Sequence, residues 1–294
     1  MTTLIQVIVS GILVGGLYGI ISSGLSLSFG ISKIANFAHA DFVTIGMYST
    51  FLMVGLFSSW GLLLAPVIAA VIGLIGVLVY VLLLRRSHLR ATNDDEAHLP
   101  QVVITAGLGI LIQSVLLTIF GSNDRSISTV LDGSLRIGGI AISKAQLVAF
   151  AVSTVAFIAL ELVVTRTEFG RALRAIVDDG EQAAAVGVNR TAMVASSMGI
   201  GVGLAGLAGA LLATYQTVTP TSGFGYLAMA FVVIILGGLG SIRGAFIAGI
   251  VVGIVQQATG TYIALDLQNV AIWVLFLVVL LVRPHGLFGK GVTL

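Results

Sequence analysis

The feature that most constrains this chain is the recurrence, from end to end, of apolar runs of about 20 residues, each long enough to cross about 30 Å of hydrocarbon. Hydrophobic residues make up 57% of the sequence and charged residues only 9%, unlike soluble globular domains. Lipid offers the backbone no hydrogen bonds, so each span must satisfy its own as a helix, and strand-like alternation is absent. The sequence therefore predicts an all-α, polytopic transmembrane helical bundle.

About eight or nine spans are expected from these runs. Two stretches are unusual: 227–239 is short, and the stretch between Phe29 and Asp41 is either a loop or a break in the helix within the membrane, near residues 30–41. Since no polar stretch is long enough for a soluble domain, residues 1–294 are expected to form a single transmembrane domain. The expected spans are Leu4–Phe29, Phe37–Phe57, Leu62–Leu84, Val102–Phe120, Ala145–Val164, Met193–Tyr215, Leu227–Leu239, Ala245–Tyr262 and Val270–Val282.

Lysine and arginine in the short loops predict the sides of the membrane, because cytoplasmic loops carry more of them. Loops 85–101 and 165–190 are arginine-rich and two spans separate them, so both are expected in the cytoplasm. Loop 121–144 then faces outward although it carries three basic residues. The same count places the C-terminus inside and the N-terminus outside, unless a re-entrant break near Asn36 changes it.

A charged island at residues 165–190 interrupts the apolar sequence and holds eight charged residues. From Phe169 to Val186 its spacing is helical, with an apolar stripe on one side. Gly170 and Gly180 punctuate this helix, and Gly187 ends it. The stripe consists of Phe169, Leu173, Ile176 and Val177.

The charges of this island are balanced, and small side chains follow them. A helix that lies on lipid is rich in Lys and Arg above bulky apolar residues. Mixed charge and small side chains instead favour docking into a groove of a soluble protein, with an ordinary solvated connector as the alternative. The residues concerned are Arg171, Arg174, Asp178, Asp179 and Glu181, followed by Ala183, Ala184 and Ala185.

Several glycines in the spans recur at intervals of four, which places them on one helix face, where two backbones can approach closely. The frequency of glycine in membrane helices explains their number but not this spacing. These sets predict close helix crossings. They are Gly11, Gly15 and Gly19, then Gly199 and Gly203, and then Gly249 and Gly253.

Asn36, His39 and Asp41 form the most polar cluster at membrane depth. A charge at the bilayer centre costs at least ~2.5–3.5 kcal/mol, so such residues line a cavity, form pairs or lie near the interface. In a regular helix Asp41 faces away from His39, so the three residues could serve one site only if the helix is broken here. The alternative is a structural role, in which Asn36 or Asp41 caps a helix start.

Other polar residues in the spans are weaker candidates for a solute path. Gln113 is one of them, and Tyr18 is another, although an aromatic belt at the membrane interface also fits Tyr18. Glu161 is expected to pair locally with Arg166 near the interface. The small number of charges in the spans favours a zwitterionic or neutral solute over an ion.

Several functional classes have no motif in the sequence. There is no G-x-x-x-x-G-K-[ST] loop, so this chain is not expected to bind and hydrolyse ATP by itself. No H-E-x-x-H motif, nucleophile elbow or carboxylate pair occurs, so neither catalysis nor a metal site is expected. The chain has no cysteine, which excludes disulfides and thiolate metal sites, and its net charge of +2 is too small to favour nucleic acid.

Four segments together resemble one family, the integral membrane permeases of high-affinity branched-chain amino acid ABC transporters, and specifically the shorter of their two permeases. The likeness covers essentially the whole chain. Ala40 and Asp41 stand where the family usually has Gly and Glu, which keeps the acid but shortens it. The segments are ISKIANFAHADFVTIGMY (31–48), FGRALRAIVDDGEQAAAVGVN (169–189), AFVVIILGGLGSIRGAFIAGIVVGIVQ (230–256) and RPHGLFGK (283–290).

This resemblance implies an importer in the bacterial inner membrane. Its expected partners are a second homologous permease, two cytoplasmic ATPase subunits, an external solute-binding protein, the amino-acid substrate and membrane lipid. ATP and Mg would bind to the ATPases, so no cofactor is expected in this chain. Relatives with similar segments import urea, short amides or aromatic acids, which remain alternative substrates. A secondary transporter or channel, or a membrane-embedded scaffold, is a more distant alternative.

The resemblance also assigns roles to particular residues. The expected ATPase-coupling residues, in the cytoplasmic loop 165–190, are Gly170, Arg171, Arg174, Asp178, Asp179, Ala184 and Gly187. The expected helix-packing residues are Gly237, Gly238, Gly240 and Gly244. The candidate substrate path comprises Asn36, His39, Asp41, Tyr18 and Gln113.

Overall fold

The computed structural model describes residues 2–33, 35–90, 94–283 and 286–288, so part of the 283–290 segment lies outside the described residues. Helices dominate, and one short antiparallel hairpin pairs Ser134 with Ser143. The α-helices are α1 (Thr2–Ser32), α2 (Asp41–Phe57), α3 (Ala65–Val79), α4 (Arg85–Arg90), α5 (Asp94–Phe120), α6 (Lys144–Arg166), α7 (Glu168–Asp178), α8 (Gly180–Ala185), α9 (Arg190–Leu212), α10 (Ser222–Gly237), α11 (Ile242–Tyr262) and α12 (Gln268–Val282). The short elements are η1 (Ser58–Leu64), η2 (Tyr80–Leu84), η3 (Leu265–Leu267), β1 (Ser134–Ile137) and β2 (Ile140–Ser143).

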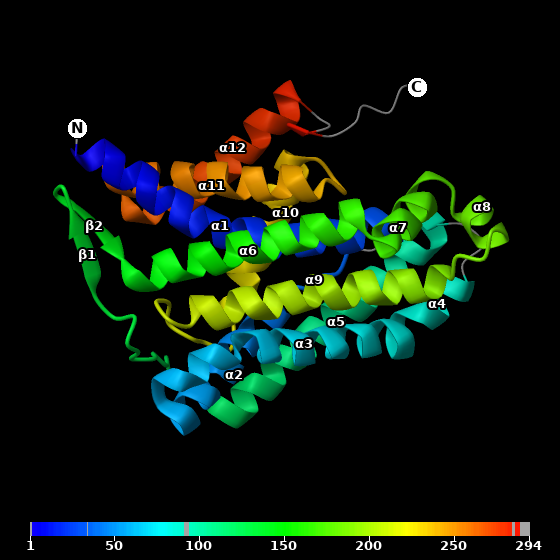
Figure 1. Ribbon diagram of the computed structural model, residues 1–294, viewed down its shortest axis with the longest axis horizontal. Coiled ribbons are helices and arrows are strands. Elements are labelled where there is room, and N and C mark those ends of the chain that lie inside the picture. Colours follow the sequence, from blue (N-terminus) through cyan, green and yellow to red (C-terminus); the bar gives the residue numbers. More distant parts are fainter. Residues whose placement is uncertain (1, 34, 91–93, 284–285, 289–294) are drawn as a thin grey trace.

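The long helices run along one axis of an elongated bundle, in which α9 is seen between α6 and α3 (Figure 1). In the described part of the chain, seven helical segments are long and apolar enough to cross a membrane, and α10 is a shorter apolar helix. One of the seven, Asp41–Ser87, contains two passes, because η1 turns the chain back until Gly61 touches the backbone of Met53. The expected eight or nine spans and the all-helical bundle are confirmed.

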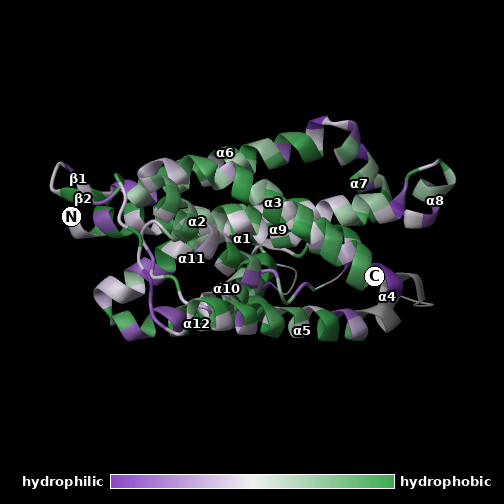
Figure 2. Ribbon diagram, turned by 90° about the horizontal axis from the view of Figure 1, so that it is seen from below, coloured by the Kyte–Doolittle hydropathy of each residue, from purple (hydrophilic) through white to green (hydrophobic). Residues whose placement is uncertain are grey.

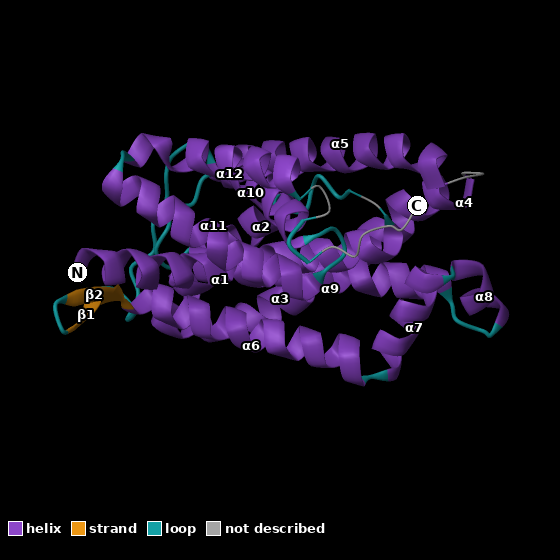
Figure 3. Ribbon diagram, turned by 90° about the horizontal axis from the view of Figure 1, so that it is seen from above, coloured by secondary structure: helices purple, strands orange, loops and turns teal. Residues whose placement is uncertain are grey.

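The two ends of the bundle carry different loops. The N-terminus and the β1–β2 hairpin lie at one end, and α4, α7 and α8 lie at the other (Figures 1 and 3). Apolar residues cover the long helices, while hydrophilic residues gather near the ends (Figure 2). The arrangement confirms that loops 85–101 and 165–190 share a side and that loop 121–144 lies opposite. The arginine content of the first two predicts that the α7–α8 end faces the cytoplasm.

Helices α1 and α11 cross in close backbone contact, and glycine makes this contact possible. A Cβ atom added to Gly15 would lie 2.6 Å from the Cα of Ile250, and one added to Gly249 would lie 2.5 Å from the Cα of Gly19. No side chain fits in this space, so the two backbones touch directly. The close approach predicted from the four-residue glycine spacing is confirmed here.

The second glycine set works in the same way between α9 and α3. A Cβ atom on Gly199 would lie 3.0 Å from the carbonyl oxygen of Gly73, and one on Gly203 would lie 2.9 Å from that of Ala69. Helix α9 is the most buried of the candidate spans, so it needs small residues on each face that packs against a neighbouring helix.

The break expected near residues 30–41 is present inside the bundle. Helix α1 ends at Ser32, Lys33 has a left-handed φ of 55°, and helix α2 starts only at Asp41. The chain then turns back into the bundle, because the His39 Nε2 atom lies 3.0 Å from the carbonyl oxygen of Ile21. Ile21 lies about 16 Å back along α1 at 1.5 Å per residue. Residues 35–40 are therefore a re-entrant segment, and this name is used for them below.

The charged island folds as two helices, α7 and α8, and the single helix expected from Phe169 to Val186 is wrong. Asp179 separates the two in an extended conformation, and its Oδ1 atom accepts hydrogen bonds from the amides of Glu181 (3.0 Å) and Gln182 (2.9 Å). A short acidic side chain competes in this way for backbone amides and starts a new helix.

The apolar stripe of α7 is also narrower than expected, because the Val177 side chain is 49% exposed while Leu173 and Ile176 are buried. The end at Gly187 agrees with the expectation, since Gly187 has a φ of 93°, which favours glycine.

Candidate functional site

The three polar residues of the re-entrant region are all buried, and each has a different partner. The Asn36 Oδ1 atom accepts from the amide of Ala38 (3.1 Å) and so closes a turn. His39 contacts the Ile21 carbonyl of α1, and the Asp41 Oδ1 atom accepts from the Gln113 Nε2 atom at 2.9 Å. The structure thus unites Asp41 with Gln113 and gives Asn36 and His39 separate local contacts.

Helix α5 forms one wall beside the re-entrant segment. The Thr105 hydroxyl accepts from the amide of Phe37 at 3.2 Å, and a Cβ atom on Gly109 would lie 2.5 Å from Asp41 Oδ2. On the other side, the Phe37 ring packs against Phe231 of α10 at 5.2 Å between centroids. The re-entrant segment therefore lies between α5 and α10.

Sequence reasoning missed several polar residues around this segment. Buried side-chain atoms near it have no hydrogen-bond partner among the described residues, and buried polar atoms are costly in that state. The four-residue spacing of Gln101 and Thr105 on one face of a span was a signal that could have found Gln101. Asn36 and His39 were already candidates from the sequence. The residues with such atoms are Asn36 (Nδ2), His39 (Nδ1), Thr44 (Oγ1), Tyr48 (hydroxyl) and Gln101 (Nε2).

Tyr18, the remaining candidate for the path, belongs to a different cluster. Its hydroxyl donates to the Gln256 Oε1 atom of α11 at 2.8 Å. Its ring packs with apolar residues of α10, α11 and α12, among them Val232, Val252 and Ile272. Tyr18 thus joins α1 to α11, in a cluster that does not include Asn36, His39 or Asp41.

A polar cavity opens beside Gln113 at the end of α5 that lies opposite to α7 and α8. Its volume is about 330 Å³, within the range typical of small-molecule sites. Gln113 connects it to Asp41, because its side chain both lines the cavity and donates to that carboxyl group. We call this cavity the outer pocket; its polar lining residues are Gln113, Ser114, Ser122, Asp124, Thr219 and Thr221.

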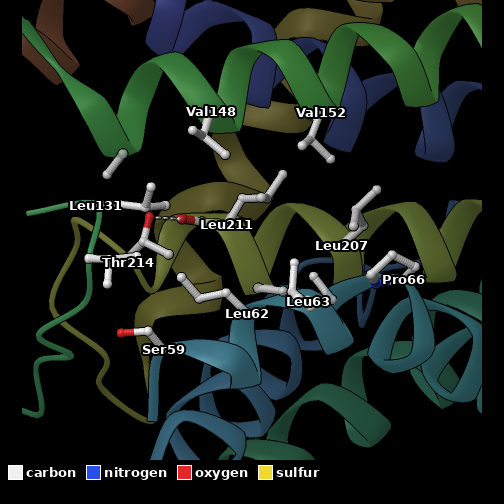
Figure 4. Close-up of a pocket in the computed structure, with 14 residues that line it drawn as sticks. Ser59, Leu62, Leu63, Pro66, Leu131, Val148, Val152, Leu207, Leu211 and Thr214 are labelled. Carbon is white, nitrogen blue, oxygen red and sulfur yellow. Dashed lines mark hydrogen bonds between the residues drawn. The ribbon is translucent and has the colours of Figure 1, made fainter.

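A second cavity of about 330 Å³ lies between α3, α6 and α9 and is almost entirely apolar. Val148 and Val152 of α6 face Leu207 and Leu211 of α9 across it (Figure 4). Its Thr214 hydroxyl is already engaged with the Leu211 carbonyl at 2.7 Å. This cavity offers no charged group to a polar solute, so the polar site is the region of Asp41, Gln113 and the outer pocket.

The α7–α8 unit presents a surface of mixed charged and apolar residues at its end of the bundle. Arg171 pairs with Glu168 at 3.1 Å on the surface, and Asp178, Asp179 and Ala184 are exposed. Two apolar side chains are exposed beside them, Val177 at 49% and Val186 at 80%.

Two of the residues expected to couple to an ATPase face the chain itself instead. Gly170 is buried against the backbone of Val164 at the end of α6, where no side chain would fit. The Arg174 guanidinium donates to the same Val164 carbonyl. Both residues thus fix the angle between α6 and α7.

An ion pair links this end of α6 to α11. Glu161 pairs with Arg243 through Oε1 and Nε at 2.6 Å, so the expected local pairing with Arg166 is wrong. Phe157, one turn before Glu161 on α6, stacks on Phe246, one turn after Arg243 on α11, with 4.0 Å between the ring centroids. The two contacts hold α6 beside the start of α11.

The four glycines at 237–244 form the turn between α10 and α11. Gly237 and Gly244 lie in direct backbone contact. Gly238 and Gly240 have φ values of 95° and 83°, which favour glycine. Gly240 also lies against Gly30 of α1, where an added Cβ atom would be 3.3 Å from the Gly30 Cα.

Comparison with known proteins identifies the group to which this architecture belongs. The family described as "Branched-chain amino acid transport system / permease component" matches residues 7–282. The chain is 30% identical over 298 residues to the high-affinity branched-chain amino acid transport system permease protein LivH of Salmonella typhimurium, covering 97% of this chain and 96% of that protein.

Two further relatives are similar over the same extent. The permease protein BraD of Pseudomonas aeruginosa is 30% identical over 297 residues, covering 97% of this chain and 96% of BraD. The probable LivH of Methanocaldococcus jannaschii is 26% identical over 294 residues, covering 97% and 92%. No solved structure matches the chain significantly. The family match over nearly all of its spans shows that this chain belongs to the family of branched-chain amino acid transport permeases.

Proposed function

We propose that this protein is the membrane-spanning subunit of an ATP-driven importer of branched-chain amino acids in the cell inner membrane. The observation that carries the proposal is the family match across residues 7–282, in which relatives of similar length are named as such permeases. ATP and Mg bind to separate cytoplasmic ATPase subunits, since this sequence has no phosphate-binding loop. An external solute-binding protein and a second permease complete the assembly.

The path for the amino acid runs along the face between α5 and α10. Support comes from the re-entrant segment between these helices and from the outer pocket beside Gln113. Broken helices and polar side chains at membrane depth are typical of transporter pathways. Asp41, at the start of α2, stays bound to Gln113 and holds α2 against the α5 wall of the path.

The α7–α8 unit transmits the motion of the ATPases to the bundle. Its exposed apolar residues Val177 and Val186, set among balanced charges, suit a groove in a soluble protein. The Arg174 contact with Val164 and the Glu161–Arg243 pair connect the unit through α6 to α11. A displacement of α7 is thereby passed to the α10–α11 turn.

Reconstitution tests this function directly. The purified chain with its partner permease, ATPases and binding protein in liposomes is expected to accumulate radiolabelled leucine only when ATP is supplied. An ATPase variant without the catalytic glutamate is the matched control and should show no uptake. Leucine uptake by the permeases alone, without ATPases, would instead establish a channel or secondary transporter.

A further inference from the structure

Two outer loops build the rim of the outer pocket, and the backbone fixes them to each other. The amide of Arg125 donates to the Val218 carbonyl (3.1 Å), and the amide of Val218 donates to the Arg125 carbonyl (2.8 Å). This isolated bridge joins the loop after α5 to the loop before α10. The rim is thus held in place by backbone bonds that do not depend on the lining side chains.

The formal charge of the pocket lining is negative. Asp124 is its one ionisable side chain, and it has no ion pair among the described residues. The adjacent Arg125 turns away, because its guanidinium donates to the Phe120 carbonyl (2.9 Å) and lies 5.2 Å from the centre of the Phe51 ring. The pocket therefore attracts a cationic group and offers no cation to a carboxylate.

Gln113 adds an acceptor on the inner side of the pocket. One of the two Nε2 hydrogens goes to the Asp41 carboxyl group, and the carbonyl oxygen can accept a hydrogen bond from a ligand. Ile110 and Leu117 lie on the same face of α5, one turn before and after, and give the pocket an apolar wall. Acceptors beside an apolar wall match a solute with both an ammonium group and an aliphatic chain.

We propose that the outer pocket binds the ammonium group of the incoming amino acid, through the Asp124 carboxylate and the Gln113 carbonyl oxygen. This site rests on the importer function proposed above and adds the chemistry by which the permease itself receives the substrate. The aliphatic side chain lies against Ile110 and Leu117, while the carboxylate points to the open side of the pocket. The Asp41–Gln113 hydrogen bond keeps Gln113 oriented for this contact.

Cysteine labelling tests the ligand chemistry without requiring transport, and the natural chain contains no cysteine. In the assembled complex, Ser114→Cys and Thr221→Cys should react with a membrane-impermeant thiol reagent added from outside. Leucine and isopentylamine should slow this reaction, whereas 4-methylpentanoate, which lacks the amine, should not. Ser126→Cys on the same loop, outside the pocket lining, is the matched control and should react at an unchanged rate.

Protection by 4-methylpentanoate but not by isopentylamine would overturn the proposal. So would failure of both pocket cysteines to react from outside while the cysteine at position 126 reacts, because the pocket would then be covered.

Transport by the full complex gives the second test. Asp124→Asn should lower the maximal rate of leucine uptake roughly tenfold, since a hydrogen bond to a charged group becomes a neutral one. Asp266→Asn removes an exposed acid of η3, which lies outside the pocket, and should leave uptake unchanged. Equal uptake by Asp124→Asn and the parent would overturn this site and leave the importer function standing. Absence of leucine uptake by the parent complex, with amine-specific protection intact, would overturn only the importer function.

Discussion

At the scale of single residues, the decisive contact is the hydrogen bond between Asp41 and Gln113. Asp41 is the first residue of α2, directly after the re-entrant segment, and Gln113 lies on α5. A buried carboxyl group without a partner is costly, so this contact both stabilises the break and fixes the position of α5. Because Gly109 has no side chain, α5 passes close to this carboxyl group: an added Cβ atom would lie 2.5 Å from Asp41 Oδ2.

Asp41→Leu is expected to destabilise the protein by about 1–3 kcal/mol, because Gln113 would lose its buried partner. Asp41→Asn keeps an acceptor for the Gln113 amide and should retain most of the stability. Thermal unfolding of the purified complex in detergent distinguishes the two variants. Equal melting temperatures for Asp41→Leu and the parent would show that the contact has no structural role.

Asn36→Leu is expected to slow the maximal rate of uptake while the affinity of the external binding protein for its ligand stays unchanged. The Asn36 side chain closes the turn that carries the re-entrant segment, and leucine cannot accept from the Ala38 amide. Asn36→Asp is the matched control, since it keeps that acceptor. Uptake rates in vesicles measure the effect, and an unaltered rate in the leucine variant would place the path elsewhere.

At the scale of elements, the α7–α8 unit shows how one short side chain divides a helix. Asp179 supplies an N-cap for α8 and interrupts α7, so two helices with different directions replace one. Arg174 and Gly170 fix this unit to the end of α6, which leaves Ala184, Val177 and Val186 for contact with another protein. The contacts with α6 fix the unit to the bundle, and its exposed face is free to bind another protein. The unit can therefore transmit motion from that protein to the bundle.

Ala184→Trp is expected to uncouple leucine uptake from ATP hydrolysis while membrane insertion stays normal. Extra bulk in a packed interface costs about 1–3 kcal/mol, which weakens the contact with the ATPase. Ala184→Ser adds one oxygen atom and should behave like the parent. Substrate-stimulated ATP hydrolysis is the measurement, and normal stimulation in the tryptophan variant would remove Ala184 from the interface.

Reversing the Glu161–Arg243 pair tests the link between α6 and α11. Arg243→Glu should reduce uptake by charge repulsion, and adding Glu161→Arg in the same chain should restore it. The effect on stability should stay below about 1 kcal/mol, because the Arg243 side chain is 68% exposed and surface pairs contribute little. If the double variant transports no better than Arg243→Glu, the pair does not act as a unit.

At the scale of the whole molecule, close glycine crossings hold a bundle that lacks a hydrophobic driving force between its helices. In lipid, helices associate through close packing, and the α1–α11 and α3–α9 contacts supply it. Helix α9 is enclosed by its neighbours, whereas α6 and α12 face mostly outward. The bundle therefore has a rigid glycine-packed centre and more loosely attached outer helices.

Gly249→Leu is expected to reduce sharply the yield of monodisperse protein, because its side chain would collide with the backbone of Gly19. Gly55→Leu is the matched control, since nothing lies within 4 Å of a Cβ atom at that position. Size-exclusion chromatography in detergent compares the two. Equal yields would mean that the α1–α11 crossing adapts to a large side chain.

The sequence alone determined the class of fold, the division into spans, which loops share an end of the bundle and which glycines allow close packing, because these depend on local properties. Each span must bond its own backbone, arginines mark the cytoplasmic loops, and a four-residue spacing places glycines on one face. Only the tertiary structure decided which polar residues meet. Asp41 and Gln113 lie 72 residues apart, and Glu161 and Arg243 lie 82 apart. Their pairing follows from how the helices cross, and no local pattern in the sequence encodes a crossing between distant spans.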